Sequence, residues 1–308
     1  MAFLLRRQEE GLVDIVIPAA NSGTDIEIDV GRWRQLCEGA PAPVALYPCH
    51  STHPDGIQGR AAELPCASGF STSIRSQGRE PGGSFWRRYD AFVGPEEPAL
   101  RSLLINRGVA ARQIAAGADG ICAFNWHANA DSLREHLTTM GDAATLAGAD
   151  CIFPVGHRTV GRGAPANDQD RIDAQLPVEL HPTLDGRGPR LALFAGGADG
   201  SPAARAFLRV RLAEFVAGDE VRVWFEGEAL PSPESVEYAL DPAGHTYVSG
   251  AVWLTYPLGA AFDAGRGAAR SFTVEVGLAH RHPQMESALV LSDVEVALVP
   301  ERQPLAAL

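Results

Sequence analysis

Polar and aromatic side chains follow three short apolar runs in the first half of the chain, and they could bind or cleave a small polar molecule. The runs cover residues 12–18, 44–48 and 120–126 and have the composition of buried strands. In proteins with parallel strands, ligands bind where the strands end and the next loops begin. The residues that we predict to bind substrate at these ends are Asn21, Tyr47, His50, Asn125, Trp126 and His127.

Carboxylates near the same strand ends are candidates for acid–base catalysis. Asp25 follows the first run, Asp55 the second and Asp131 the third. Each also has a structural interpretation, because Asp is common in turns and at helix N-termini. Most glycosidases need two carboxyl groups about 5–10 Å apart, one protonated and one ionised. These three residues are therefore candidates for catalysis, without a defined pair.

Other reactive groups near the second run suggest no complete site. His50 and His53 could bind a metal ion, but a loop lacks the helical spacing that makes an HExxH motif convincing. Cys49 precedes His50, yet no orienting acid or oxyanion loop accompanies this thiol. No glycine-rich phosphate-binding pattern follows a strand. We therefore predict neither a metal nor a cofactor.

Helical patterns separate the three runs. Asp29 can cap a helix over residues 30–38, and a second helix is expected over residues 99–116, with Gly117 in its C-terminal turn. A third helix starts near Asp131. This βαβαβα order predicts parallel strands joined by helical crossovers. The long segment over residues 49–98 contains several aromatic residues and is expected to cover the site in part.

The second half of the chain has a different pattern. Several short runs alternate apolar and polar residues, as half-buried antiparallel strands do. These runs cover residues 190–195, 207–212, 220–225, 272–276 and 289–298. We therefore predict an α/β region at residues 1–155, a linker at residues 156–175 and an antiparallel β-sandwich at residues 176–308.

Three stretches of sequence resemble bacterial glycoside hydrolase-like proteins that combine a (β/α)8 barrel with a C-terminal β-sandwich. Residues 117–126 read GADGICAFNW, similar to the family's last barrel strand, GADGIYLFNW, and residues 141–148 are similar to the GDPETLAG-like stretch that follows it. Residues 289–296 resemble the end of the family's sandwich. The resemblance implies the last three βα units of a TIM-type barrel followed by the sandwich. The chain would then lack the first five barrel strands.

The same resemblance implies a carbohydrate-active protein with carbohydrate as its partner. Many barrel glycosidases place catalytic carboxyls after the fourth and seventh strands. The run that would be the seventh strand ends in residues 47–50, YPCH, which contain no Glu. Two alternatives follow: a truncated fragment without independent activity, or a non-catalytic carbohydrate-binding or scaffold protein. Trp224, Trp253 and Tyr256 of the sandwich could form a binding platform for such a protein, or could equally lie in the core.

Composition narrows the classes of partner. The chain has 308 residues and a formal net charge of -12, which argues against nucleic-acid binding. Its five cysteines have no CxxC spacing, and it contains neither a signal peptide nor a membrane-spanning apolar run. We expect a cytoplasmic protein without a membrane partner. Three parallel strands cannot close a barrel, so self-association or pairing with a missing N-terminal half is expected.

Overall fold

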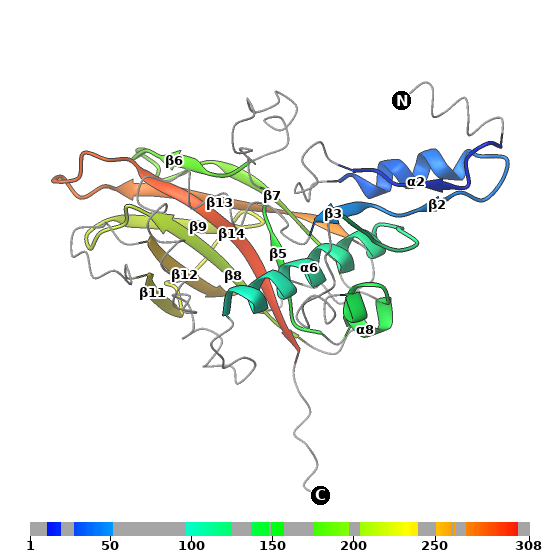
Figure 1. The fold of residues 1–308 in the computed structure, drawn as a ribbon. Coiled ribbons are helices and arrows are strands. Elements are labelled where there is room, and N and C mark those ends of the chain that lie inside the picture. The colour runs from blue at the N-terminus through cyan, green and yellow to red at the C-terminus, as the bar shows by residue number, and fades with distance from the viewer. Residues whose placement is uncertain are drawn as a thin grey trace, which may run out of the picture.

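The structure is a computed structural model, and its described residues contain more β-strand than helix. The residues that it describes are 11–19, 28–51, 97–124, 137–147, 149–156, 175–196, 204–239, 251–259, 262 and 269–300. Two antiparallel sheets form the larger part of the molecule, and a small group of parallel strands lies at one end beside helix α2 (Figure 1).

One antiparallel sheet has four strands in the order β10-β9-β13-β7. Its strands are β7 (Arg190–Ala195), β9 (Glu220–Phe225), β10 (Glu228–Ala229) and β13 (Arg270–His280). Glu226 and Gly227 join β9 to β10 with positive φ angles of 52° and 85°, as a tight hairpin turn requires.

The other antiparallel sheet has six strands, with β11-β12-β8-β14-β5 in order and β6 also paired to β14. Its strands are β5 (Cys151–Pro154), β6 (Val178–Leu180), β8 (Ala204–Ala213), β11 (Ser235–Ala239), β12 (Ala251–Pro257) and β14 (Leu289–Pro300). The strand β5 pairs in antiparallel register with β14, and Val296 lies opposite Phe153.

The inner faces of the two sheets enclose one apolar core. Alternate residues of each long strand point into it, including Leu208 of β8, Val274 of β13 and Val296 of β14. Phe272 stacks on Phe225 and on Phe262, with ring centroids 5.3 and 4.7 Å apart. The alternation of apolar and polar residues therefore correctly predicts antiparallel strands in the second half of the chain.

The helix α6 (Glu97–Ala115) covers part of the outer face of the six-stranded sheet (Figure 1). A second apolar cluster joins the helix to this face. Its members are Leu104, Ile105 and Val109 of the helix with Ile152, Phe207, Ala297 and Val299 of the sheet. The helix α8 (Ala143–Ala147) also contributes Leu146 to the main core.

The parallel strands are short. The strand β1 (Ile15–Val16) pairs with β2 (Ala45–Leu46), and helix α2 (Val30–Glu38) connects them. The strand β3 (Cys49–Ser51) pairs with β4 (Cys122–Phe124). The predicted parallel pairing of the three runs is thus confirmed.

The prediction of a partial TIM-type barrel is wrong. Antiparallel sheets dominate the described residues, and the parallel pairs do not extend there into the repeated βα units of a barrel. Helix α6, expected only as a barrel crossover, has its apolar face against the outside of the antiparallel sheet. An amphipathic pattern shows that a helix buries one face but does not specify the sheet that it covers.

Candidate functional site

The carboxyl-terminal edge of the three parallel strands is the first candidate site. The chain over residues 44–51 is the middle strand. On one side Tyr47 N donates to Val16 O at 2.9 Å, and on the other Cys122 N donates to Pro48 O at 2.9 Å. The bridge between Ala19 and Cys49 is also parallel. All three strands therefore run in one direction, so their carboxyl ends lie at one edge.

Asp119 lies just before β4 and binds groups of helix α2 and strand β2. Its carboxylate accepts hydrogen bonds from the guanidinium of Arg34 at 2.5 Å and from the backbone N–H of Leu46 at 2.8 Å. Arg34 also donates to the carbonyl oxygen of Gly117 at 2.7 Å. Burial opposes ionisation of Asp119, but these hydrogen bonds outweigh burial and lower the pKa of the carboxyl group. The pair thus fixes helix α2, β2 and the turn before β4 together.

Tyr47 and Cys49 belong to the middle strand, and Cys122 belongs to its neighbour β4. The ring of Tyr47 lies against Gly120, where a Cβ atom would come within 2.6 Å of the ring carbon Cε1. Cys49 is buried and lies directly opposite Cys122 in the parallel register. Burial and a hydrogen-bond contact with the Cys122 thiol raise the pKa of Cys49 to about 11. A thiol held protonated in this way is a poor nucleophile near neutral pH.

The described structure contains only part of the predicted substrate site. The backbone of His50 lies in β3 opposite Ala123, and Tyr47 lies just before β3. The predicted site residues that fall outside the described residues are Asn21, Asp25, Asp55, Asn125, Trp126, His127 and Asp131. Their roles stay predictions. His53 of the HxxH motif also lies outside this part of the chain.

The outer face of the six-stranded sheet carries a second polar cluster. Arg209 and Arg211 of β8 lie opposite Glu295 and Asp293 of β14, at N–O distances of 2.7 and 3.4 Å. The side chains of Arg209 and Glu295 are only 2% and 1% exposed. The Arg209 guanidinium stacks over Trp253, with Cζ 4.3 Å from the ring centroid. This cluster resembles a buried ion-pair network more than an open binding face.

The four-stranded sheet has a similar arrangement on its own outer face. Arg187 lies over Trp224, with Cζ 4.2 Å from the ring centroid, and pairs with Glu275 at 3.1 Å. Arg190 pairs with the same carboxylate at 3.1 Å. The guanidinium groups of Arg187 and Arg209 therefore cover Trp224 and Trp253, and each guanidinium is also ion-paired.

The proposed aromatic platform on the sandwich is not available to a ligand. Trp224 and Trp253 are 7% and 6% exposed, and Tyr256 is 3% exposed within the core. Burial raises the pKa of the Tyr256 hydroxyl well above its ordinary value. Arginine side chains cover the two tryptophans and Tyr256 packs in the core, so these residues do not form a platform.

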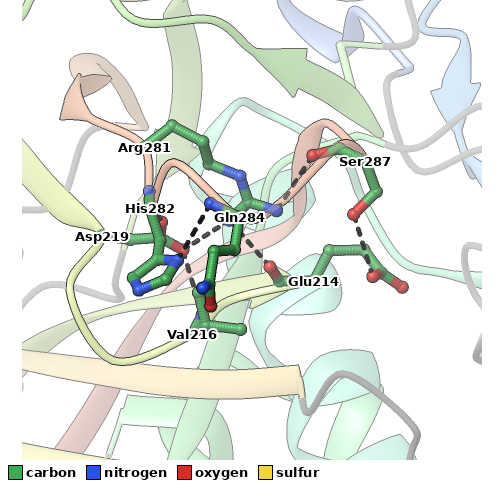
Figure 2. Close-up of polar contacts among 7 residues, drawn as sticks. All are labelled: Glu214, Val216, Asp219, Arg281, His282, Gln284 and Ser287. Atoms are coloured by element: carbon green, nitrogen blue, oxygen red, sulfur yellow. Dashed lines mark hydrogen bonds and ion pairs between the residues drawn. The ribbon is translucent and has the colours of Figure 1, made fainter.

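A third polar cluster ties two loops at one end of the sandwich (Figure 2). Asp219 accepts hydrogen bonds from Arg281 at 2.5 Å and from the backbone N–H of His282 at 2.9 Å. Arg281 also donates to the carbonyl oxygens of Glu214 and Ser287, at 2.9 and 3.0 Å. The carboxylate of Asp219 is fully buried. Its hydrogen bonds link the β8–β9 connection to the β13–β14 connection, so the cluster has a structural role.

The described residues contain neither a group of metal ligands nor a membrane-spanning helix. In the ranges that the structure describes, no three His, Cys, Asp or Glu side chains gather as metal ligands would. Within the same ranges, no helix combines the length and apolar character needed to cross a bilayer.

Sequence reasoning missed the ion pairs on the outer faces of the sheets and the pairing of Arg34 with Asp119. The signal for the outer-face network is two arginines at i, i+2 in residues 209–211 and two carboxylates at i, i+2 in residues 293–295, because residues two apart share a strand face. The pairing of Arg34 with Asp119 has no comparable signal, because the two residues are 85 positions apart.

Comparisons with known proteins give no family. No protein-family model and no curated protein sequence matches this chain. Among solved structures, BuGH86 in complex with neoagarooctaose has a TM-score of 0.30 and 8% identity, over 49% of this chain and 19% of that chain. The C-terminal CBM6 of LamC, a marine laminarinase from Zobellia galactanivorans, has a TM-score of 0.20 and 11% identity, over 48% of this chain and 98% of that chain.

A third solved structure covers most of this chain. A two-domain esterase active on acetylated mannans, co-crystallised with mannopentaose, has a TM-score of 0.23 and 12% identity, over 98% of this chain and 77% of that chain. All three are carbohydrate-active or carbohydrate-binding proteins. Their TM-scores are too low to establish a shared fold, so the functional argument depends on the chain itself.

Proposed function

We propose that this chain binds carbohydrate at the carboxyl-terminal edge of its three parallel strands. The observation that carries the proposal is the parallel register of β3 and β4, in which Ser51 lies opposite Phe124. The two strands therefore end at the same edge. Along the sequence, β4 is followed by Asn125, Trp126 and His127, which the resemblance to glycoside hydrolase-like proteins places in a substrate site.

The chemistry of these residues suits a neutral sugar. Amide and imidazole groups donate and accept hydrogen bonds, and an aromatic ring covers the apolar face of a sugar. Tyr47 supplies a further ring and hydroxyl beside the same strands, and its packing on Gly120 holds the ring in one place. Such a site combines apolar surface with a few convergent polar groups, as small-molecule sites generally do.

The proposed activity of this chain is binding without hydrolysis. A glycosidase needs a matched pair of carboxyl groups, and the candidates Asp25, Asp55 and Asp131 do not occupy the family's catalytic positions. The buried carboxylates on the six-stranded sheet are ion-paired, so they do not replace the missing pair.

A binding experiment tests this function. The full chain is screened against a broad oligosaccharide array, and the best ligand is measured by titration calorimetry. The changes Asn125→Ala and Trp126→Ala should each weaken binding about tenfold or more, because a central contact contributes more than about 1.4 kcal/mol. The exposed Leu184→Ala serves as the control and should bind as the unchanged chain does.

Two outcomes would contradict the proposal. The first is the absence of binding to any oligosaccharide on the array. The second is binding that both site changes leave intact. Assays on a glycoside panel should detect no turnover. Turnover abolished by Asp25→Asn, Asp55→Asn or Asp131→Asn would show that the chain is an enzyme.

A further inference from the structure

Two of the five cysteines face each other across the parallel pair of β3 and β4. Cys49 and Cys122 are direct partners in the register, so their side chains are on the same face of the sheet. Adjacent strands lie about 4.8 Å apart, which falls within the Cα separation of about 4.4–6.8 Å that a disulfide requires. The two thiols are also in hydrogen-bond contact with each other.

We propose that Cys49 and Cys122 form a reversible dithiol–disulfide pair that covalently joins β3 to β4. Both thiols are free in this structure. The parallel register places the two Cα atoms opposite each other, at the separation of adjacent strands that a disulfide can span. The inference is independent of carbohydrate binding, although the linked strands lead into the candidate site.

The other described cysteines lie in different surroundings. Cys37 packs in the small apolar cluster beneath helix α2. Cys151 lies in β5 within the main core, where burial raises the pKa of its thiol to about 12. In β5 the residue opposite Cys151 is Leu298 of β14. Among the described cysteines, only Cys49 and Cys122 are strand partners of each other.

The oxidant is a low-molecular-weight disulfide such as oxidised glutathione. Cys122 is partly exposed, whereas Cys49 is buried, so Cys122 reacts first. Its thiolate attacks one sulfur of the reagent, the S–S bond of the reagent breaks, and one reagent thiolate leaves and takes up a proton. Cys49 then loses its proton to water and attacks the Cys122 sulfur, and the second reagent thiol leaves. Two protein thiols lose two electrons and two protons, which reduce one reagent disulfide to two thiols.

The buried position of Cys49 sets the speed of the second step. Burial and the contact with Cys122 raise the pKa of Cys49 to about 11, so its thiolate is scarce at neutral pH. The mixed disulfide at Cys122 should therefore accumulate before the protein disulfide forms. The closing rate should rise about tenfold per pH unit between pH 7 and pH 9, because the thiolate fraction rises in that proportion.

The experiment uses the full chain. It is incubated with oxidised glutathione at pH 7 and pH 9, quenched with acid, and examined by intact mass and by non-reducing peptide mapping. The expected sequence is a glutathione adduct at Cys122 and then a Cys49–Cys122 peptide with the mass of two hydrogens lost. The thermal midpoint should rise by several degrees on oxidation and return on reduction, because the cross-link restricts the unfolded chain.

Variants separate the first step, at Cys122, from the closing step, at Cys49. Cys49→Ser should give a stable glutathione adduct at Cys122. Cys122→Ser should react with glutathione much more slowly, because Cys49 is then the only thiol of the pair and it is buried. Cys37→Ser is the matched control and should form the disulfide as the unchanged chain does. A disulfide from Cys49 or Cys122 to Cys66, or formation only after denaturation, would overturn the inference. So would the absence of any cross-link at pH 9.

Discussion

Gly108 lies where helix α6 crosses β5, and the absence of a side chain allows the two backbones to touch. A Cβ atom at this position would come within 1.9 Å of the carbonyl oxygen of Ile152. Gly31 in helix α2 is different, because its nearest neighbour, Asp29 Oδ1, would be 3.7 Å from the added atom. The same residue type therefore has opposite constraints in the two helices.

The change Gly108→Ala should destabilise the chain by about 2–3 kcal/mol or more, because backbone atoms must move to accept the methyl group. Gly31→Ala should be neutral or stabilise by up to about 1 kcal/mol, because alanine favours the helix. Chemical unfolding followed by circular dichroism measures both. Equal stability of the two variants would show that α6 does not approach β5 so closely.

Single residues differ in how far the sequence predicts their roles. The roles of Asp29 as a helix cap and of Gly117 in the turn after α6 were predictable, because both depend on neighbours along the chain. The structure confirms them: Asp29 accepts from Arg32 N at 3.0 Å, and Gly117 has a φ of 102°. The close approach at Gly108 was not predictable, because it depends on a partner strand more than 40 residues away.

At the scale of elements, the Arg34–Asp119 pair joins α2 to the parallel strands and gives a pH dependence. The pKa of Asp119 is lowered in the folded chain, so its ionised form stabilises folding above the ordinary pKa near 3.8. This stability is lost as the pH falls below that value through the folded pKa. The side chain is 47% exposed, so solvent screening limits the effect to below about 1 kcal/mol.

The change Asp119→Asn should therefore lower stability at pH 7 and flatten the decline between about pH 4 and pH 2. Urea unfolding at a series of pH values measures the difference between the variant and the unchanged chain. The control is Glu38→Gln, at an exposed position of helix α2, which also contains Arg34. A difference that does not vary with pH would show that the carboxylate is not coupled to folding.

The two classes of ion pair in the sheets should differ strongly in energy. Arg209 and Glu295 are almost fully buried at 2.7 Å, whereas Arg222 and Glu220 at 2.6 Å are about half exposed. The change Glu295→Ala leaves a buried guanidinium without this counter-charge and should cost about 3–5 kcal/mol. Glu220→Ala should cost less than about 1 kcal/mol. If Glu295→Ala and Glu220→Ala lower stability equally in thermal unfolding, the Arg209–Glu295 pair is not more buried than the Arg222–Glu220 pair.

The elements were predictable where the local pattern is sufficient. Alternation marks β7 and β9 at residues 190–195 and 220–225, and the observed strands have the same bounds. The helix pattern likewise marks Val30–Glu38. The partners of these elements were harder to predict. Three short parallel strands suggest a barrel, but only contacts between distant residues show that α6 and β5 join the antiparallel sheet.

At the scale of the whole molecule, the connection between the two halves of the chain gives the last prediction. The proposed boundary places residues 1–155 and 176–308 in separate domains, and this division stays a prediction. Yet β5 pairs with β14, and α6 covers apolar residues of the same sheet, Phe207, Ala297 and Val299. A fragment of residues 176–308 would expose this apolar surface and leave β14 without its β5 partner over residues 295–298, although β6 would still pair with residues 289–291.

Such a fragment should melt at a lower temperature than a fragment of residues 97–308, and it should self-associate, because exposed apolar patches and open strand edges promote association. The longer fragment retains α6 and β5 and should keep the sandwich folded and monomeric. Thermal melts by circular dichroism and mass in solution by light scattering distinguish the two. If the shorter fragment is monomeric and melts with the longer one, the sandwich is an independent domain, and α6 with β5 adds little to its stability.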